Sequence, residues 1–242
     1  TSDFLLGRWH ENASLRGQVL RRLAHALGTP GNEGLLLGLP RVDRIPIIRQ
    51  RVEHLVKVRD LKTANRLVRL GLNWGHDSTL RFLEGQVLYE SGQVSEGIGY
   101  MSMALEVLRQ EGTVSVQNLL ILGDALLRHG GSEGQREGLN LIEDAAQVAG
   151  EITDSILDQF LRVSLDLLEF RAVSRIATKI KTPPGVQRLA RSLLPLLDHR
   201  DLLDQCGFEI LGVIGSALKA DSEDKALREA YKRVREIAEG KA

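Results

Sequence analysis

The stretch Gly130-Gly131-Ser132-Glu133-Gly134 fits the G-x-S-x-G pattern of a hydrolase nucleophile elbow. In such an elbow a buried strand precedes the serine and a helix follows it, so that the hydroxyl is exposed to attack a carbonyl carbon. Here the residues before the motif carry a helical period instead. We therefore interpret the stretch as a glycine-rich turn between two helices. We predict no catalytic residue in this chain and expect no enzyme activity of its own.

Histidine, carboxylate and thiol side chains could supply other chemistry. The histidines are scattered and have no zinc-ligand spacing: they are His10, His25, His54, His76, His129 and His199. Asp198, Asp201 and Asp204 could form a carboxylate pair, but a polar turn that caps the following helix is favoured. Cys206, the only cysteine, lies on an apolar stripe, which favours a buried structural thiol. No metal or other cofactor is expected.

The first fifty-odd residues are locally basic. They contain Arg16, Arg21, Arg22, Arg41, Arg44, Arg49 and Arg51. An RNA- or phosphate-binding edge would use such residues. A solvated helix face and loop is favoured, because no aromatic stacking residues are interleaved with the arginines.

Composition excludes several classes of function. The 242 residues are 43% hydrophobic and 26% charged, which is typical of a soluble globular protein. Lysine plus arginine and aspartate plus glutamate both total 32, so no overall basic field attracts nucleic acid or an anionic membrane. A neutral chain is compatible with self-association. The single cysteine fits a reducing compartment, and we expect a cytoplasmic protein without membrane insertion.

Apolar residues recur at helical spacing through almost the whole chain. Residues 28–46 are the exception, because they are rich in glycine and proline and predict a long loop, either a junction or a functional segment. The sequence Thr182-Pro183-Pro184-Gly185 predicts a sharp break between helices. The last helix, roughly residues 222–239, is strongly charged, as the end of a helical stack requires. These features suggest three segments: an N-terminal helix and the glycine- and proline-rich loop over 1–46, helical repeats over 47–221, and a capping helix over 222–242.

Small residues recur in two successive predicted helix pairs. Gly85 and Gly97 occupy the two helices of the first pair, with Gly92 at the turn between them. In a second copy Gly123 lies 38 positions after Gly85, and Gly138 corresponds to Gly97, with three extra residues between the two helices. Small residues at these spacings let paired helices approach closely. The pattern resembles the tetratricopeptide repeat (TPR), whose period is about 34 residues. Residues 47–72 form a weaker copy, in which Ala64 corresponds to Gly97.

The TPR resemblance implies an all-α solenoid, a right-handed superhelix of five or six stacked antiparallel helix pairs. In that family the first helices of successive repeats line a concave groove that binds a peptide or a partner protein. By position the groove would contain Thr79, Phe82, Gln86, Tyr89, Glu90, Gln117, Leu120, Asp124, Leu127 and Arg128. Tyr89 and Arg128 are the expected hot spots, since tyrosine and arginine dominate interfaces. Phe82, Leu120 and Leu127 could instead serve only in packing.

The resemblance favours a non-catalytic scaffold that binds a protein or peptide. Three alternatives stay open. The chain could be a helical accessory domain of a larger enzyme, such as a glycosyl- or phosphotransferase. It could be an RNA-binding helical repeat, or an enzyme with a site in residues 28–46. The Lys-x-x-x-Asn pattern that clamps C-terminal carboxylates in some TPR domains is absent.

Overall fold

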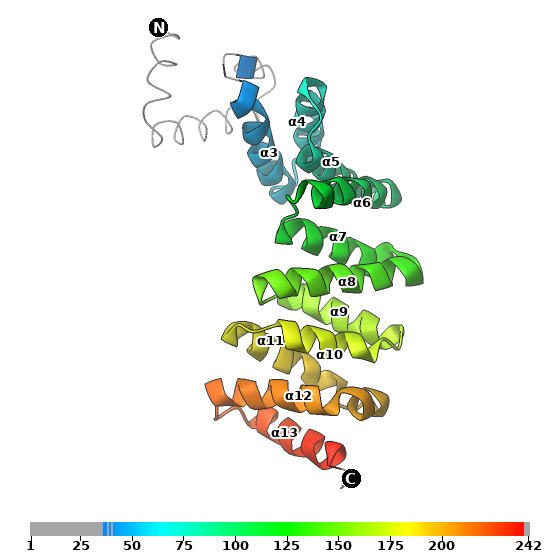
Figure 1. Cartoon of the computed structure of the whole chain (residues 1–242), viewed down its shortest axis with the longest axis vertical. Helices are drawn as coiled ribbons and strands as arrows, with labels where there is room; N and C mark the ends of the chain where they lie inside the picture. Colours follow the sequence, from blue (N-terminus) through cyan, green and yellow to red (C-terminus); the bar gives the residue numbers. More distant parts are fainter. Residues whose placement is uncertain (1–35, 38, 40, 240–242) are drawn as a thin grey trace. The chain divides into compact units, whose positions relative to one another are not determined.

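The computed structural model describes residues 36–37, 39 and 41–239. Over this range the chain forms eleven α-helices and no strand (Figure 1). The chain divides into two compact units, residues 1–113 and residues 114–242. The division falls inside the range 47–221 that the sequence suggests for a single run of repeats.

The first unit contains two helix pairs. They are α3 (Arg41–Lys57) with α4 (Leu61–Trp74), and α5 (Ser78–Glu90) with α6 (Val94–Glu111). α5 packs on both helices of the preceding pair, so the pairs are stacked. Their shared core includes Ile48, Val52, Leu67, Leu80 and Val87, each nearly or fully buried. The apolar residues that recur at helical spacing in the sequence are thus the ones that the core buries.

The second unit contains three further pairs and a final helix. The helices are α7 (Val116–His129), α8 (Gly131–Ala149), α9 (Asp154–Asp166), α10 (Phe170–Lys179), α11 (Pro183–Leu193), α12 (Arg200–Ala220) and α13 (Lys225–Ala238), with a 3-10 turn at Leu194–Leu196. α7 contacts α9 and α9 contacts α11, while α8 contacts α10 and α10 contacts α12. The second unit is therefore a two-layered stack. Figure 1 shows α8, α10 and α12 in front, with α9 and α11 behind them.

The turns inside three of the helix pairs share one geometry. Each turn places a residue in the left-handed region, at Arg59, Gly92 and Leu168, with φ of 64°, 89° and 57°. The next residue then donates its amide to a carbonyl five residues back: Asp60 to Leu55 at 2.9 Å, Gln93 to Leu88 at 3.0 Å, and Glu169 to Ser164 at 2.7 Å. This bond satisfies a carbonyl that the end of a helix leaves free. The recurrence supports a repeated hairpin unit that extends beyond the two clearest copies.

The glycines of the sequence pattern lie where paired helices meet. A Cβ atom on Gly85 would lie 2.8 Å from the carbonyl oxygen of Gly97. A Cβ atom on Gly138 would lie 2.9 Å from the carbonyl oxygen of Gly123. Real Cβ contacts are not this short, so glycine is needed for the helices to approach. The close packing expected from these small residues is confirmed in both hairpins.

Two boundaries differ from the expectation. The loop expected through Pro46 ends by Arg41, because Pro46 lies inside α3. The Pro46 side chain is exposed, while the neighbouring Ile47 and Ile48 are buried, and their burial stabilises the helix in spite of the missing amide. At the second break, Pro183 and Pro184 do more than end α10: they form the first turn of α11, where a missing amide costs nothing.

The final helix is close to its expected position. Asp224 caps α13, its side chain accepting the amide of Leu227 at 3.1 Å. Leu227, Ala230 and Val234 face the core, and most of the other residues of α13 are charged. None of the described helices combines the length and the apolar character that crossing a membrane requires.

Candidate functional site

The groove residues expected on α5 have different environments. Thr79, Gln86, Tyr89 and Glu90 are partly exposed. Phe82 has no exposed surface and is among the largest fully buried side chains. Phe82 is therefore a packing residue and not a partner contact, because it lies on the face of α5 that is turned into the protein.

The groove residues expected on α7 belong to the second unit. Gln117 and Arg128 are exposed and Asp124 is partly exposed. The Arg128 Nε donates to both carboxylate oxygens of Asp124, at 3.0 and 2.9 Å. Leu127 is fully buried and Leu120 partly buried, as core residues of this unit. The α5 and α7 residues thus do not belong to one compact unit.

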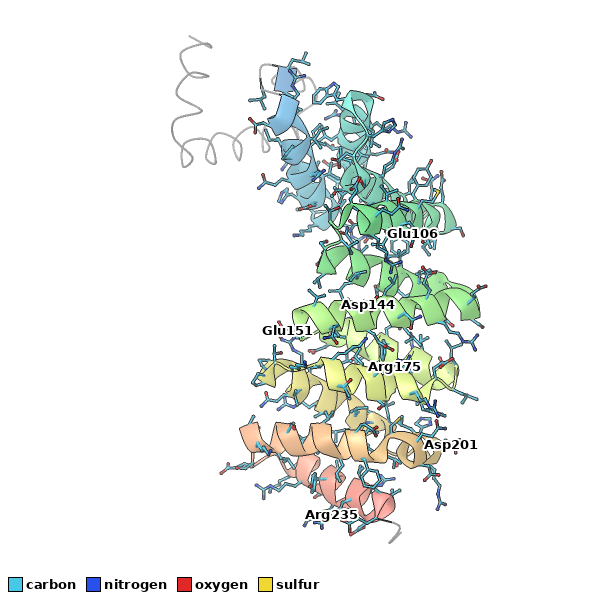
Figure 2. All side chains as sticks on the ribbon, in the orientation of Figure 1. Glu106, Asp144, Glu151, Arg175, Asp201 and Arg235 are labelled. Atoms are coloured by element: carbon cyan, nitrogen blue, oxygen red, sulfur yellow. The ribbon has the colours of Figure 1, made fainter. Side chains whose placement is uncertain are left out.

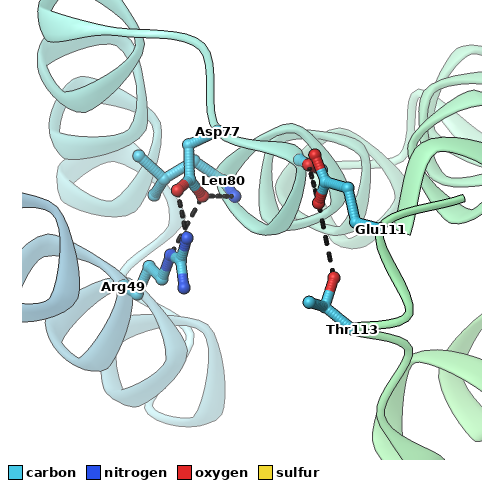
Figure 3. A network of polar contacts seen from close by, with 6 residues as sticks. Arg49, Asp77, Leu80, Glu111 and Thr113 are labelled. Atoms are coloured by element: carbon cyan, nitrogen blue, oxygen red, sulfur yellow. Dashed lines mark hydrogen bonds and ion pairs between the residues drawn. The ribbon is translucent and has the colours of Figure 1, made fainter. Parts of the chain in front are cut away.

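Polar side chains of α3, α5 and α6 form a network in the first unit (Figure 3). Arg49 pairs with Asp77, which also caps α5 by accepting the amide of Leu80 at 2.8 Å. Glu111, at the end of α6, accepts hydrogen bonds from Ser78 at 2.6 Å and from Thr113 at 3.3 Å. These contacts connect the start of α5 to α3 and to the end of α6, so the role of the network is structural.

Two of the N-terminal arginines, Arg44 and Arg49, bind groups of the protein itself. The Arg44 side chain donates to the carbonyls of Leu37 and Leu39 and lies 5.4 Å from the ring centroid of Trp74. Arg49 is held by Asp77. Arg16, Arg21 and Arg22 lie outside the described residues. Arg44 and Arg49 thus bind groups of the protein itself, which favours a structural role over an RNA- or phosphate-binding one.

A cleft of about 680 Å³ lies between α9 and α11 in the second unit. Both helices belong to the layer formed by α7, α9 and α11. The lining combines charged, polar and apolar side chains: Asp154, Asp158, Leu161, Arg162, Pro184, Gln187, Arg188, Arg191, Ser192, Pro195 and Leu196. Its size falls within the range of about 300–1,000 Å³ that is typical of ligand sites.

The sequences of α9 and α11 explain why these residues face outward. In α9 the apolar residues Leu157, Phe160 and Leu161 are buried, so the opposite face carries Asp158 and Arg162. In α11 the buried residues are Leu189, Ala190 and Leu193. Thr182 caps α11 by accepting the amide of Gly185 at 3.2 Å. The buried apolar faces thus hold both helices against the rest of the unit, and their more polar faces line the cleft.

The arginines of the cleft differ in how far their hydrogen-bonding capacity is used. Arg188 lies 3.5 Å from Asp154 and 3.7 Å from Glu151, and it donates to the carbonyl of Ile152 at 3.4 Å. Arg191 lies 3.7 Å from Asp224, which is too long for a good hydrogen bond. Arg188 thus has three partners at the start of α9, whereas Arg191 has one, the Asp224 carboxylate.

Arg162 and Asp158 have even fewer contacts. The Arg162 guanidinium donates to the side-chain oxygen of Gln159 on its own helix. Among the described residues Asp158 has no cationic group within ion-pair distance. The cleft therefore offers guanidinium donors together with a free carboxylate.

A smaller pocket of about 440 Å³ lies in the first unit, beside the start of α5. Its apolar wall comes from α6, where Tyr100, Met103 and Val107 recur at helical spacing. Met103 is 63% exposed and Val107 is 44% exposed. This wall is an apolar stripe that no described segment covers.

The remaining residues that the sequence suggested for chemistry lie in helices or in the core. The turn expected over residues 130–134 is shorter: Gly130 alone separates α7 from α8, and Ser132 lies in the first turn of α8, preceded by a helix and not by a strand. Cys206 is buried and its Sγ lies 3.1 Å from the Phe170 carbonyl oxygen, and burial raises the pKa of this thiol. The expected cap of α12 is corrected: its cap position is His199, whose side chain makes no capping bond.

Asp198 does not pair with the other two carboxylates of its group, because it binds Arg233 of α13 at 2.7 Å. In the part of the chain that the structure describes, no group of three histidine, cysteine or acidic side chains is placed to hold a metal ion.

No family model and no curated protein matches this sequence. The arrangement of helices therefore has to be interpreted from the structure itself.

The sequence contained a signal for the cleft that the search for motifs missed. Asp154, Asp158 and Arg162 are four residues apart, which places them on one face of a helix. Arg188 and Arg191 lie on one face of the next-but-one helix. Only the contact between α9 and α11 shows that the two faces meet.

Proposed function

We propose that the chain is a non-catalytic interaction module of stacked helix pairs, and that it binds a protein or peptide partner in the cleft between α9 and α11. The observation that carries this proposal is the cleft itself, which opens between successive first helices of the stacked pairs. In TPR-like repeats these helices form the binding surface, so the likeness supports the same use here.

The chemistry of the lining also favours binding. Arginine side chains present planar groups with five N–H donors, and they are enriched in protein interfaces. Leu161, Leu196 and two prolines supply apolar surface between the charged groups. A mixed lining of this kind suits a polypeptide segment, whose backbone and side chains offer both kinds of surface.

The experiment is affinity capture from a lysate of the source cells, with the full chain as bait. The test variant is Arg162→Ala/Arg191→Ala, which removes the two least engaged guanidinium groups of the cleft. The control is Arg171→Ala, an exposed arginine on α10 in the other layer. We expect a partner that both wild type and the control capture and that the test variant loses. Equal capture by all three proteins would refute the cleft as the binding site.

A further inference from the structure

We propose that the exposed face of α12 pairs with the same face of a second copy of this chain, in an antiparallel arrangement that makes a symmetric dimer. This face shares no residue with the cleft between α9 and α11, so the inference does not depend on the proposed function. Three observations carry it: an exposed aromatic side chain, a groove on the same helix, and two charged residues that flank them.

An apolar groove of about 630 Å³ follows α12 on the surface of the second unit. Leu211, Leu218 and the ring of Tyr231 supply its apolar surface. Gly215 keeps it open, because a Cβ atom there would lie 3.1 Å from the Tyr231 ring. Phe208 also lines the groove, and its side chain is 71% exposed. A continuous apolar surface of this kind, unlike a single exposed apolar residue, is typical of an interaction site.

Phe208 and the groove are complementary to each other in an antiparallel pair of α12 helices. When a two-fold axis relates two identical helices, residues equally far from the axis on either side oppose each other. We place the axis between Leu211 and Gly212. Phe208 of each copy then opposes Gly215 of the other copy, beside Tyr231. The aromatic side chain that is exposed in the single chain thus fills the groove of the second copy.

The same register brings opposite charges together. Asp204 lies one turn before Phe208, and Lys219 lies one turn after Gly215, so all four residues are on one face of α12. Asp204 and Lys219 are equally far from the axis, and each carboxylate therefore opposes an ammonium group of the other copy. Both side chains are exposed, and neither forms an ion pair within the part of the chain that the structure describes.

The agreement of apolar and charged contacts on one register favours a second copy over an unrelated partner, whose binding would not require it. The remaining acidic residue in the middle of α12 does not disturb this register. Glu209 lies to the side of the face and accepts a hydrogen bond from Ser174 at 3.0 Å. The whole chain has no net charge, so no overall repulsion opposes its pairing.

The shape of α12 permits the close approach that this pairing needs. Gly212, at the crossing point, is exposed, and a Cβ atom there would have no neighbour within 4 Å. The stretch from Asp204 to Lys219 is roughly 22 Å long at about 1.5 Å per residue. Helices that cross at about 20° stay in contact over such a length. A single helix face is a small interface, so we expect a weak dimer.

The first test is sedimentation velocity of the full chain over roughly 1–300 μM, a range suited to weak dimers. We expect a concentration-dependent shift from monomer to dimer. Phe208→Ala should weaken the dimer at least roughly tenfold, since the aromatic side chain supplies much of the buried apolar area. The matched control is Val148→Ala on α8, where the side chain is 72% exposed, and it should dimerise like the wild type. A wild type that stays monomeric, or a dimer that Phe208→Ala leaves unchanged, would overturn the proposal.

Exchanging the charges tests the register itself. Asp204→Lys and Lys219→Glu should each be mainly monomeric alone, because each homodimer would oppose two pairs of like charges. An equimolar mixture of the two variants should dimerise again, since the mixed dimer opposes one native and one reversed pair of opposite charges. Circular dichroism confirms that each variant is folded. Dimers of either variant alone that are as stable as the wild type, or a mixture of folded variants that stays monomeric, would refute the antiparallel pairing.

Discussion

The hairpins α5/α6 and α7/α8 follow the same glycine pattern but differ in the atoms that an added Cβ would meet. A Cβ atom on Gly97 would lie 2.5 Å from the amide nitrogen of Tyr89 and 2.7 Å from the carbonyl oxygen of Gly85. A Cβ atom on Gly123 would instead lie 2.7 Å from the terminal methyl group of Ile142. In the first hairpin backbone meets backbone, whereas in the second a flexible side chain lies at one of the glycines. The same sequence pattern therefore predicts different costs of replacing glycine in the two hairpins.

The largest effect is expected for Gly97→Ala. The added methyl group cannot fit without moving the backbone of α5, so overpacking should cost about 2–3 kcal/mol of the free energy of unfolding. Trp74 packs against the core of the first unit. Urea unfolding followed by the fluorescence of Trp74, in a Trp9→Phe background, therefore reports the stability of this unit.

Gly99→Ala is the matched control for Gly97→Ala. Gly99 lies on the same helix, and a Cβ atom there would have no neighbour within 4 Å. The control should stabilise the first unit by up to about 1 kcal/mol, because alanine favours a helix more than glycine does. If Gly97→Ala and Gly99→Ala changed stability alike, the close approach of α5 and α6 would be refuted.

Ion pairs provide a second contrast between the units. Glu143 of α8 is almost fully buried. The Nε–H of Arg175 on α10, which Figure 2 labels, donates to both of its carboxylate oxygens, at 3.0 and 2.8 Å. This bond raises the pKa of Arg175. In the first unit Glu90 pairs with the more exposed Arg59.

Glu143→Gln should therefore destabilise the second unit by about 1–2 kcal/mol, since charge-assisted bonds are lost while Arg175 stays partly solvated. Glu90→Gln should cost at most about 0.5 kcal/mol. Urea unfolding followed by circular dichroism measures the first variant and fluorescence the second. Equal losses would contradict the structural role given to the buried carboxylate.

A milder effect is expected for Gly123→Ala. The Ile142 side chain can rotate away, and the gain in helix propensity offsets part of the strain, so the net cost should be below about 1 kcal/mol. Cys206 reports this unit, because a buried thiol with a raised pKa reacts only when the unit opens. Gly123→Ala should raise its labelling rate slightly. Strong acceleration would show that the second hairpin is as intolerant as the first.

The smallest effect is a stabilising one. Leu168 has a φ of 57° and is 71% exposed, in a turn where the first unit has Gly92. Leu168→Gly should stabilise the second unit by about 0.5–1 kcal/mol, since glycine adopts the left-handed region without a steric penalty. Thermal unfolding followed by circular dichroism measures the shift. A lower midpoint would mean that the Leu168 side chain stabilises the turn.

Several features of the fold follow from the sequence alone. The helical period predicted an all-α chain, and Gly85, Gly97, Gly123 and Gly138 identified the helix pairs. These signals are local, because a period or a small-residue pattern lies within one or two adjacent helices. The start of α3 was misplaced since proline was taken as a helix breaker, whereas the exposed side of an early turn tolerates it.

The candidate site was much harder to predict. The TPR resemblance pointed to α5 and α7, yet Phe82 on α5 is buried. The cleft depends on contact between α9 and α11, which are separated in the chain by another helix. No local pattern specifies which polar faces of such helices meet, so Arg162 and Arg191 could be placed together only by the structure.

The most direct test of the account is hydrogen–deuterium exchange of the full chain with and without its captured partner. The account predicts slower exchange in residues 154–166 and 183–196, which border the cleft, with little change in α5 and α6. Protection confined to α5 and α6 would contradict it and would place the binding surface in the first unit.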